Sequence, residues 1–121
     1  MEQAEFNELF RKRTKQLLVE IIRWYGHLKP KPDEIRIIRK QLIRSVTSTA
    51  ANFRAACRAR SQAERYAKLC IVVEESDETV FWLELVQDCD LAKGEKLAKF
   101  HQEAMEILKV MAASRRNLKA P

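Results

Sequence analysis

Basic side chains recur along residues 33–60 at a spacing that could bind phosphate. This segment carries seven basic and two acidic residues. With about 100° of rotation per helical residue, five of the basic residues share a sector of about 80°, opposite the apolar positions. These five residues are Arg36, Lys40, Arg44, Arg54 and Arg58. Cations clustered on one helix face are typical of nucleic-acid binding through phosphates, although a solvated helix surface has the same pattern.

Two arginines near the end of the chain, Arg115 and Arg116, could extend this basic face. No aromatic residue interrupts the face, so it offers no platform on which single-stranded bases could stack. We therefore expect contact with the backbone phosphates of structured RNA or DNA, with little sequence preference. The alternative function is a protein-interaction scaffold, in which the charge serves assembly and the protein recruits a partner enzyme.

The residue types that catalyse reactions or bind metals do not have the spacing that such sites need. A carboxylate-bridged di-iron site in a helical bundle needs Glu-x-x-His pairs. The residues three positions before His27 and His101 are instead Trp24 and Ala98. The acidic run at residues 74–78 scatters around a helix, so few of its carboxylates could converge. Because glycine-rich phosphate loops and Ser/His/Asp arrangements are also absent from the sequence, we expect no enzyme, no cofactor and no metal site.

Helices are the elements that must position the basic residues. The chain has 121 residues, of which 46% are hydrophobic and 33% are charged, and its net charge is +6. Its 2 glycines and 3 prolines are too few for the tight connections of a sandwich, barrel or doubly wound sheet. Apolar residues recur at alternating steps of three and four, which indicates amphipathic helices. We predict four helices, at about residues 5–28, 33–59, 61–88 and 93–118.

Short connections should join these helices. The segment Lys29-Pro30-Lys31-Pro32 ends the first, because proline disfavours helical geometry in the residue before it. Ser61 and Glu64 have the spacing of a capping box at the start of the third helix. Short connections place consecutive helices antiparallel. We therefore predict an all-α protein in which residues 1–121 form a single domain, an antiparallel up-down-up-down four-helix bundle.

Small residues dominate positions 45–52 of the second predicted helix. Small side chains allow two helix backbones to approach closely, so we expect a tight helix crossing at this segment. Ala50 and Ala51 should lie in the crossing, and leucine at either position should overpack it.

The third predicted helix carries more apolar surface than one bundle needs. Residues 80–86 are apolar almost all round the helix, whereas a bundle helix needs one apolar face. We expect Val80, Phe81, Trp82 and Leu85 to contribute to a contact between subunits. Residues 61–90 carry two basic and eight acidic residues, so this helix could meet a basic helix of a neighbouring subunit.

The sequence carries no signal for membrane insertion or export. Its longest apolar runs fall far short of the roughly 20 residues of a membrane span. The first five residues include two glutamates and no basic residue, unlike the basic start of a signal peptide. We therefore expect a cytoplasmic protein without a membrane partner.

The run RKQLIRSVTSTAAN at residues 39–52 contains the pattern Gln-x-x-Arg-[Ser/Ala]-x-x-Ser followed by Asn. This pattern resembles the signature of a bacterial family, the proteins encoded in intervening sequences of large-subunit (23S) ribosomal RNA genes. The run ESDETVFWLEL at residues 75–85 is similar to the third helix of the family, and NLK at residues 117–119 to its C-terminal end. Many members continue with Ile-Ala-Glu-Gly after the asparagine. Here FRAA stands at residues 53–56, with a positive charge where an acid is common.

This resemblance implies an antiparallel four-helix bundle that assembles as a homopentameric ring. The chain is also distantly similar to the accessory proteins of diversity-generating retroelements. Those proteins are basic pentameric bundles that bind nucleic acid and a reverse transcriptase. The resemblance thus implies a fold and an assembly more than a defined activity.

Overall fold

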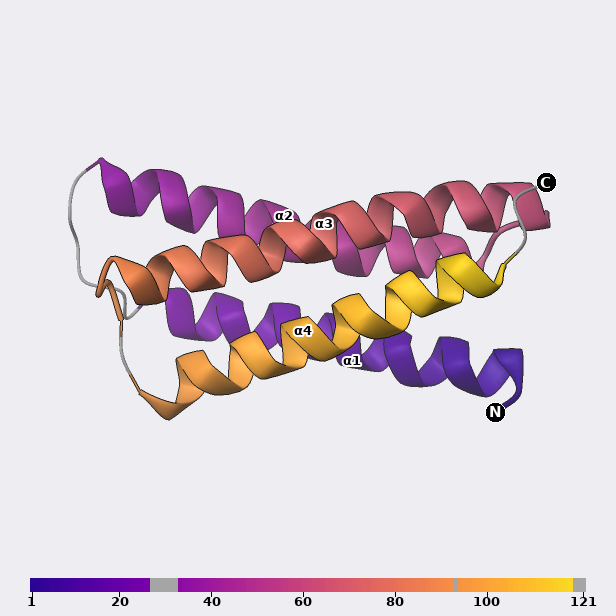
Figure 1. Ribbon diagram of the computed structural model, residues 1–121, viewed down its shortest axis with the longest axis horizontal. Helices are drawn as coiled ribbons and strands as arrows, with labels where there is room; N and C mark the ends of the chain where they lie inside the picture. Colours follow the sequence, from indigo (N-terminus) through magenta and orange to yellow (C-terminus); the bar gives the residue numbers. More distant parts are fainter. Residues whose placement is uncertain (27–32, 93, 119–121) are drawn as a thin grey trace.

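Four long helices make up most of the protein. The computed structural model describes residues 1–26, 33–92 and 94–118. The helices are α1 (Gln3–Tyr25), α2 (Glu34–Cys57), α3 (Gln62–Asp88) and α4 (Glu95–Asn117). Each helix runs in the opposite direction to the one before it (Figure 1). The predicted all-α fold class and four-helix bundle are therefore confirmed.

The helix ends lie close to the predicted positions. α1 begins two residues earlier than expected, at Gln3, and α2 ends two residues earlier, at Cys57. The predicted end of the first helix at residue 28 and the predicted start of the fourth at residue 93 lie outside the described residues. At the start of α3, the Ser61 hydroxyl accepts a hydrogen bond from the Glu64 backbone N–H at 3.1 Å. The Ser61 cap read from the sequence is thus present.

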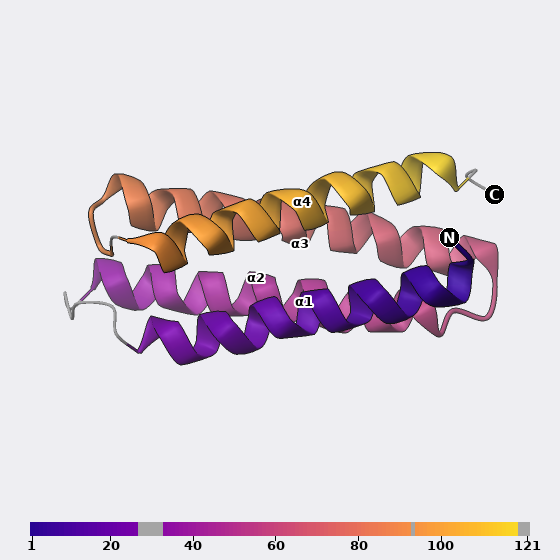
Figure 2. The ribbon, with the colours of Figure 1, turned by 90° about the horizontal axis from the view of Figure 1, so that it is seen from below.

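The helices pack around the bundle in chain order. α1 packs against α2, α2 against α3 and α3 against α4, and α4 closes the bundle against α1. Figure 2 shows α1 beside α2 and α4 beside α3. The α2–α3 pair has the most extensive packing and the α1–α4 pair the least. α2 and α4 are therefore diagonal, and the part of the chain that the structure describes has no close approach between their backbones.

Apolar residues at the predicted helical spacing form one core. All four helices contribute to it, and Ile21, Leu42, Leu69, Leu83 and Met111 are each fully buried. Burial of one such side chain stabilises a folded protein by about 1.5–3 kcal/mol. The core therefore holds the four helices at fixed rotations, which decides which charged residues meet on the outside.

The small residues at 45–52 divide between two faces of α2. Ser45 and Thr49 are buried, and the Thr79 hydroxyl of α3 donates a hydrogen bond to the Ser45 hydroxyl at 3.0 Å. This direct contact between short side chains confirms a close α2–α3 crossing. Ala51, however, is exposed and Ala50 only partly buried, and both lie on the side of α1. The prediction that Ala51 lies in a crossing is wrong, because helical rotation turns this position toward solvent, and Ala50 lies on the side of α1 and not at the α2–α3 crossing.

Candidate nucleic-acid interface

The outer face of α2 carries all five predicted cations. Helical spacing correctly predicts that each of them is exposed. These side chains are Arg36, Lys40, Arg44, Arg54 and Arg58. Their surroundings differ along the helix, because α2 has an acidic neighbour on one side and a basic one on the other. The five residues therefore do not act as one uniform stripe.

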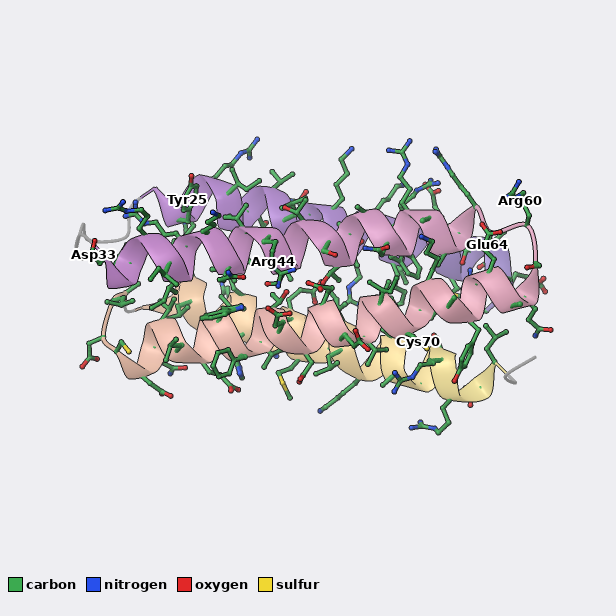
Figure 3. The ribbon with its side chains drawn as sticks, turned by 90° about the horizontal axis from the view of Figure 1, so that it is seen from above. Tyr25, Asp33, Arg44, Arg60, Glu64 and Cys70 are labelled. Carbon is green, nitrogen blue, oxygen red and sulfur yellow. The ribbon has the colours of Figure 1, made fainter. Side chains whose placement is uncertain are left out.

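Arg44 is paired with carboxylates of α3. Its Nη1 lies 2.9 Å from Glu75 Oε2, and its Nη2 pairs with Glu78. The hydrogen bond between Arg44 and Glu78 raises the pKa of Arg44 and lowers the pKa of Glu78. The Arg44 side chain lies between α2 and α3 in Figure 3. Arg44 thus belongs to the α2–α3 contact, and we leave it out of the phosphate-binding surface that the sequence suggested.

Arg36 also has an acidic neighbour, but on the protein surface. Its Nη2 lies 3.3 Å from Asp33 Oδ1, and both side chains are largely exposed. Such surface pairs are worth about 0–1 kcal/mol, so a phosphate group could compete for this guanidinium. Arg36 and Lys40 lie in the N-terminal part of α2, toward the end of the bundle where Figure 3 labels Asp33.

Arg54 and Arg58 converge with cations of α1 on a groove between α1 and α2. This groove has a volume of about 470 Å³. Its charged lining is Arg11, Lys12 and Lys15 from α1, and Arg54 and Arg58 from α2. Its remaining lining is Leu18, Thr47, Ala50 and Ala51. We call this feature the basic groove. The alanines that turn away from α3 therefore line a recess between five cations.

Carboxylates neutralise only part of the basic groove. Glu8 pairs with Arg11, and one of its oxygens lies 3.2 Å from the Lys12 ammonium nitrogen. The other three cations of the groove, Lys15, Arg54 and Arg58, have no ion pair with any carboxylate of residues 1–26, 33–92 and 94–118. Cations that line a concave surface focus a positive potential, which attracts polyanions. The basic groove is thus the strongest phosphate-binding candidate on this side of the protein.

The contribution of α1 was not predicted from the sequence. Four of the five residues at positions 11–15 are basic. Arg11, Lys15 and Leu18 also follow the steps of four and three that place residues on one helix face. The sequence therefore predicts a basic face on α1. It does not predict that this face lies beside Arg54 and Arg58 of α2.

Arg115 and Arg116 do not continue the basic face of α2. They lie near the end of α4, which packs against α1 and α3 and is diagonal to α2. The expectation that they extend the α2 face is therefore wrong. The end of α4 and the start of α1 lie at the same end of the bundle (Figure 1). These arginines thus add positive charge to that end, on a separate surface.

The residues predicted for a subunit contact are only partly exposed. Phe81 is 52% exposed and packs edge-to-face on Trp82, with ring centroids 4.9 Å apart. Leu85 and Trp82 are half-buried and pack against the core. Val80 is only 5% exposed. The prediction that Val80 takes part in a subunit contact is wrong, because its side chain faces the interior of its own bundle.

Other kinds of site have no counterpart among the described residues. Within that part of the chain, no group of three or more His, Cys, Asp or Glu side chains is arranged to hold a metal ion. None of the helices there is long and apolar enough to cross a membrane. The three cysteines, Cys57, Cys70 and Cys89, are free thiols.

Comparison with known proteins agrees with the family resemblance of the sequence motifs. Residues 8–113 match the family model described as 23S rRNA-intervening sequence protein. The structure is similar to a crystal structure of a protein with unknown function from the S23 ribosomal protein family of Bacteroides thetaiotaomicron. The two are 28% identical with a TM-score of 0.79, over 91% of this chain and 97% of that one. No curated protein matches the sequence. The family model covers most of the chain, which therefore belongs to the 23S rRNA-intervening sequence protein family.

Proposed function

We propose that this protein binds structured RNA, or another nucleic acid, through backbone phosphates that lie along the basic groove. The observation that carries the proposal is the convergence of five cations from two helices on one recess. Lys15, Arg54 and Arg58 have no carboxylate partner in the described chain, so a phosphate would not have to displace an internal ion pair. Phosphate contacts position a protein on nucleic acid without reading its bases. The expected binding is therefore salt-dependent and largely independent of sequence.

The uncharged lining of the groove favours a nucleic-acid backbone as the occupant. Ala50, Ala51 and Thr47 are short, so they leave room for a sugar-phosphate chain between the cations. Aromatic side chains, on which single-stranded bases stack, are not among the lining residues. A duplex or a folded RNA displays phosphates without needing such a stacking surface. The groove therefore suits structured nucleic acid better than an unpaired strand.

Further cations extend the proposed contact along α2. Lys40 is exposed on the same helix as Arg54, and the rise of 1.5 Å per residue separates them by about 21 Å. Arg36 lies one helical turn beyond Lys40. A duplex lying along α2 would reach both regions, with the basic groove making the stronger contact. Arg115 and Arg116 would contribute only to nucleic acid that also covers the adjacent end of the bundle.

We further propose that the protein acts as a homo-oligomer in the bacterial cytoplasm, and that it has no catalytic activity. The half-exposed Phe81 and its neighbours Trp82 and Leu85 support a contact between copies. α3 has an excess of acidic residues and the basic groove is lined by cations, so the negative charge of α3 is complementary to the positive charge of the groove. The family resemblance in the sequence implies a ring of five copies. Five grooves in one assembly would convert weak binding by each subunit into tight binding of a long nucleic acid.

The second candidate function is a protein-interaction scaffold. The exposed Phe81 lies on a helix whose acidic residues include Glu74, Glu78 and Glu84. An apolar residue among carboxylates suits a basic partner protein. This function predicts capture of a protein through α3, and it predicts no salt-dependent binding of nucleic acid near physiological ionic strength.

The decisive experiment compares two variants that lose the same charge. The groove variant carries Lys15→Ala, Arg54→Ala and Arg58→Ala. The control variant carries Lys96→Ala, Lys99→Ala and Lys109→Ala, three exposed positions on α4. Binding to a fluorescent RNA hairpin and to a DNA duplex would be measured by anisotropy over a range of salt concentrations.

We expect the groove variant to bind more weakly than the control variant and to show a flatter salt dependence. Each phosphate contact with duplex DNA contributes about −0.9 to the slope of log affinity against log salt. Loss of three contacts should therefore reduce the magnitude of the slope by up to roughly 2.7. Equal affinity and equal slope for the parent and the groove variant would exclude this groove as the nucleic-acid contact.

A further inference from the structure

A second positively charged recess lies between the end of α1 and the start of α4. Both segments lie at the end of the bundle opposite the chain's N-terminus (Figures 1 and 2). The recess has a volume of about 440 Å³. It is lined by Glu20, Arg23 and Trp24 of α1 and by Lys96, Lys99 and Phe100 of α4. We call it the α1–α4 pocket. Its volume is within the range of about 300–1,000 Å³ that is usual for small-molecule sites.

The charges of the α1–α4 pocket are unbalanced. Arg23, Lys96 and Lys99 are exposed, and no carboxylate of the described residues forms an ion pair with any of them. Glu20 is the one acidic lining residue, and its Oε1 accepts a hydrogen bond from Gln16 Nε2 at 3.1 Å. Three cations thus face a recess with one carboxylate. A multiply charged anion would relieve their mutual repulsion.

Two aromatic side chains form part of the wall of the pocket. Trp24 is only 9% exposed, and its ring packs edge-to-face on Phe100 with centroids 5.3 Å apart. Within the described residues the indole N–H of Trp24 forms no hydrogen bond and reaches solvent, whereas the indole N–H of Trp82 donates to Glu78 Oε1 at 3.3 Å. The lining therefore offers many donors and few acceptors, together with aromatic surface.

We propose that the α1–α4 pocket binds a small phosphate monoester with a planar or apolar body. A phosphate monoester carries a charge of about −1.5 to −2 at neutral pH and three acceptor oxygens. These oxygens match the positively charged side chains of Arg23, Lys96 and Lys99. The body of the ligand lies against Trp24 and Phe100. The site is separate from the basic groove and does not rest on the proposed binding of nucleic acid.

Titration with adenosine 5′-monophosphate, adenosine and inorganic phosphate tests the proposal. The chain has 2 tryptophans, so a ¹⁵N-labelled sample gives two indole N–H signals, and the Trp82→Phe variant identifies that of Trp24. We expect adenosine monophosphate to shift the Trp24 signal in a saturable way. Inorganic phosphate should bind more weakly, because it lacks a body that contacts the rings. Adenosine should leave the signal in place, because it lacks the charge.

A pair of charge-matched variants locates the site. Lys96→Ala with Lys99→Ala should weaken binding of adenosine monophosphate by at least roughly tenfold, because it removes two of the three cations that line the pocket. Lys68→Ala with Lys109→Ala, which removes the same charge from positions that line neither the pocket nor the basic groove, should leave the affinity unchanged. The titration of the parent protein is decisive by itself. An unmoved Trp24 signal, an equal response to adenosine, or binding only to an RNA hairpin would each overturn the proposal.

Discussion

Arg13 of α1 and Glu103 of α4 form a two-pronged ion pair across the least extensively packed helix pair. Arg13 Nε donates to Glu103 Oε2 at 2.9 Å, and Arg13 Nη2 donates to Oε1 at 2.5 Å. Glu106 adds a second carboxylate 3.4 Å from the same nitrogen. The hydrogen bond to Glu103 raises the pKa of Arg13. The guanidinium also lies 4.8 Å from the centre of the Phe10 ring. This pairing links α4 to α1 in the middle of both helices.

Arg13→Ala should lower the free energy of unfolding by about 1–3 kcal/mol, because it leaves Glu103 without its partner and removes the contact with Phe10. Arg13→Lys should recover only part of the loss, since an ammonium group cannot form two parallel hydrogen bonds. Urea denaturation measures both effects. Arg11→Ala, which breaks a surface pair with Glu8, is the control and should cost less than about 0.5 kcal/mol. Equal losses for Arg11→Ala and Arg13→Ala would contradict this role for Arg13.

Ala51→Leu should separate the binding function from stability. The position is exposed in the basic groove, so leucine should change the free energy of unfolding by less than about 0.5 kcal/mol. The larger side chain would narrow the groove and weaken binding to an RNA hairpin without any change in charge. Ser45→Leu, at a buried position of the same helix, should instead cost about 1–3 kcal/mol by overpacking. A strong destabilisation by Ala51→Leu would show that this face is packed.

The Arg44–Glu78 pair predicts a dependence of stability on pH. Because the pKa of Glu78 is lower in the folded protein than the usual value of 4.5, the charged carboxylate stabilises the folded state at neutral pH. That contribution is lost as the pH falls from about 4.5 through the lowered pKa. Glu78→Gln should therefore reduce the melting temperature at pH 7, and the difference from the parent should shrink in acid. A difference that stays constant down to pH 3 would exclude this pair as its source.

Phe81→Ser should weaken association between copies of the chain. Phe81 is 52% exposed on α3, so serine removes apolar contact area without opening a cavity in the core. Light scattering after size-exclusion chromatography measures the mass of the assembly. Ile22→Ser is the control, because Ile22 is 44% exposed on α1. A parent protein that is monomeric at micromolar concentration, or equal dissociation of both variants, would contradict a subunit contact at Phe81.

Local sequence signals were sufficient to predict the four helices. The apolar steps of three and four identify the buried positions of α2, such as Leu42 and Phe53, and the Ser61–Glu64 spacing identifies the start of α3. These signals depend on neighbours in the chain, so they can be read without knowing the tertiary structure. The exposure of the cations on α2 could be predicted for the same reason.

The candidate site depends on which helix faces lie side by side. The apolar periodicity of each helix gives its buried face but does not give its neighbours. Val80 and Phe81 are consecutive and both apolar, yet one is buried and the other half-exposed. Arg44 and Arg54 share a sector of α2, but Arg44 lies beside Glu75 of α3, whereas Arg54 lies about 15 Å further along α2 and lines the groove with α1. Position along the helix and rotation about its axis together decide between an ion pair and an open groove. Packing of the whole core sets those rotations.

The sequential packing of the helices has a consequence for synthesis on the ribosome. Among the four described helices, each packs against the helix made just before or after it, and of their contacts only that between α1 and α4 joins distant parts of the chain. Domains can begin to fold from the N-terminus during translation, and contacts that are local in sequence form rapidly. Three helices can therefore associate on the nascent chain while one side of their core is still open. α4 closes that side last. Until α4 has left the ribosome, the open side of the core is exposed to aggregation and to chaperones.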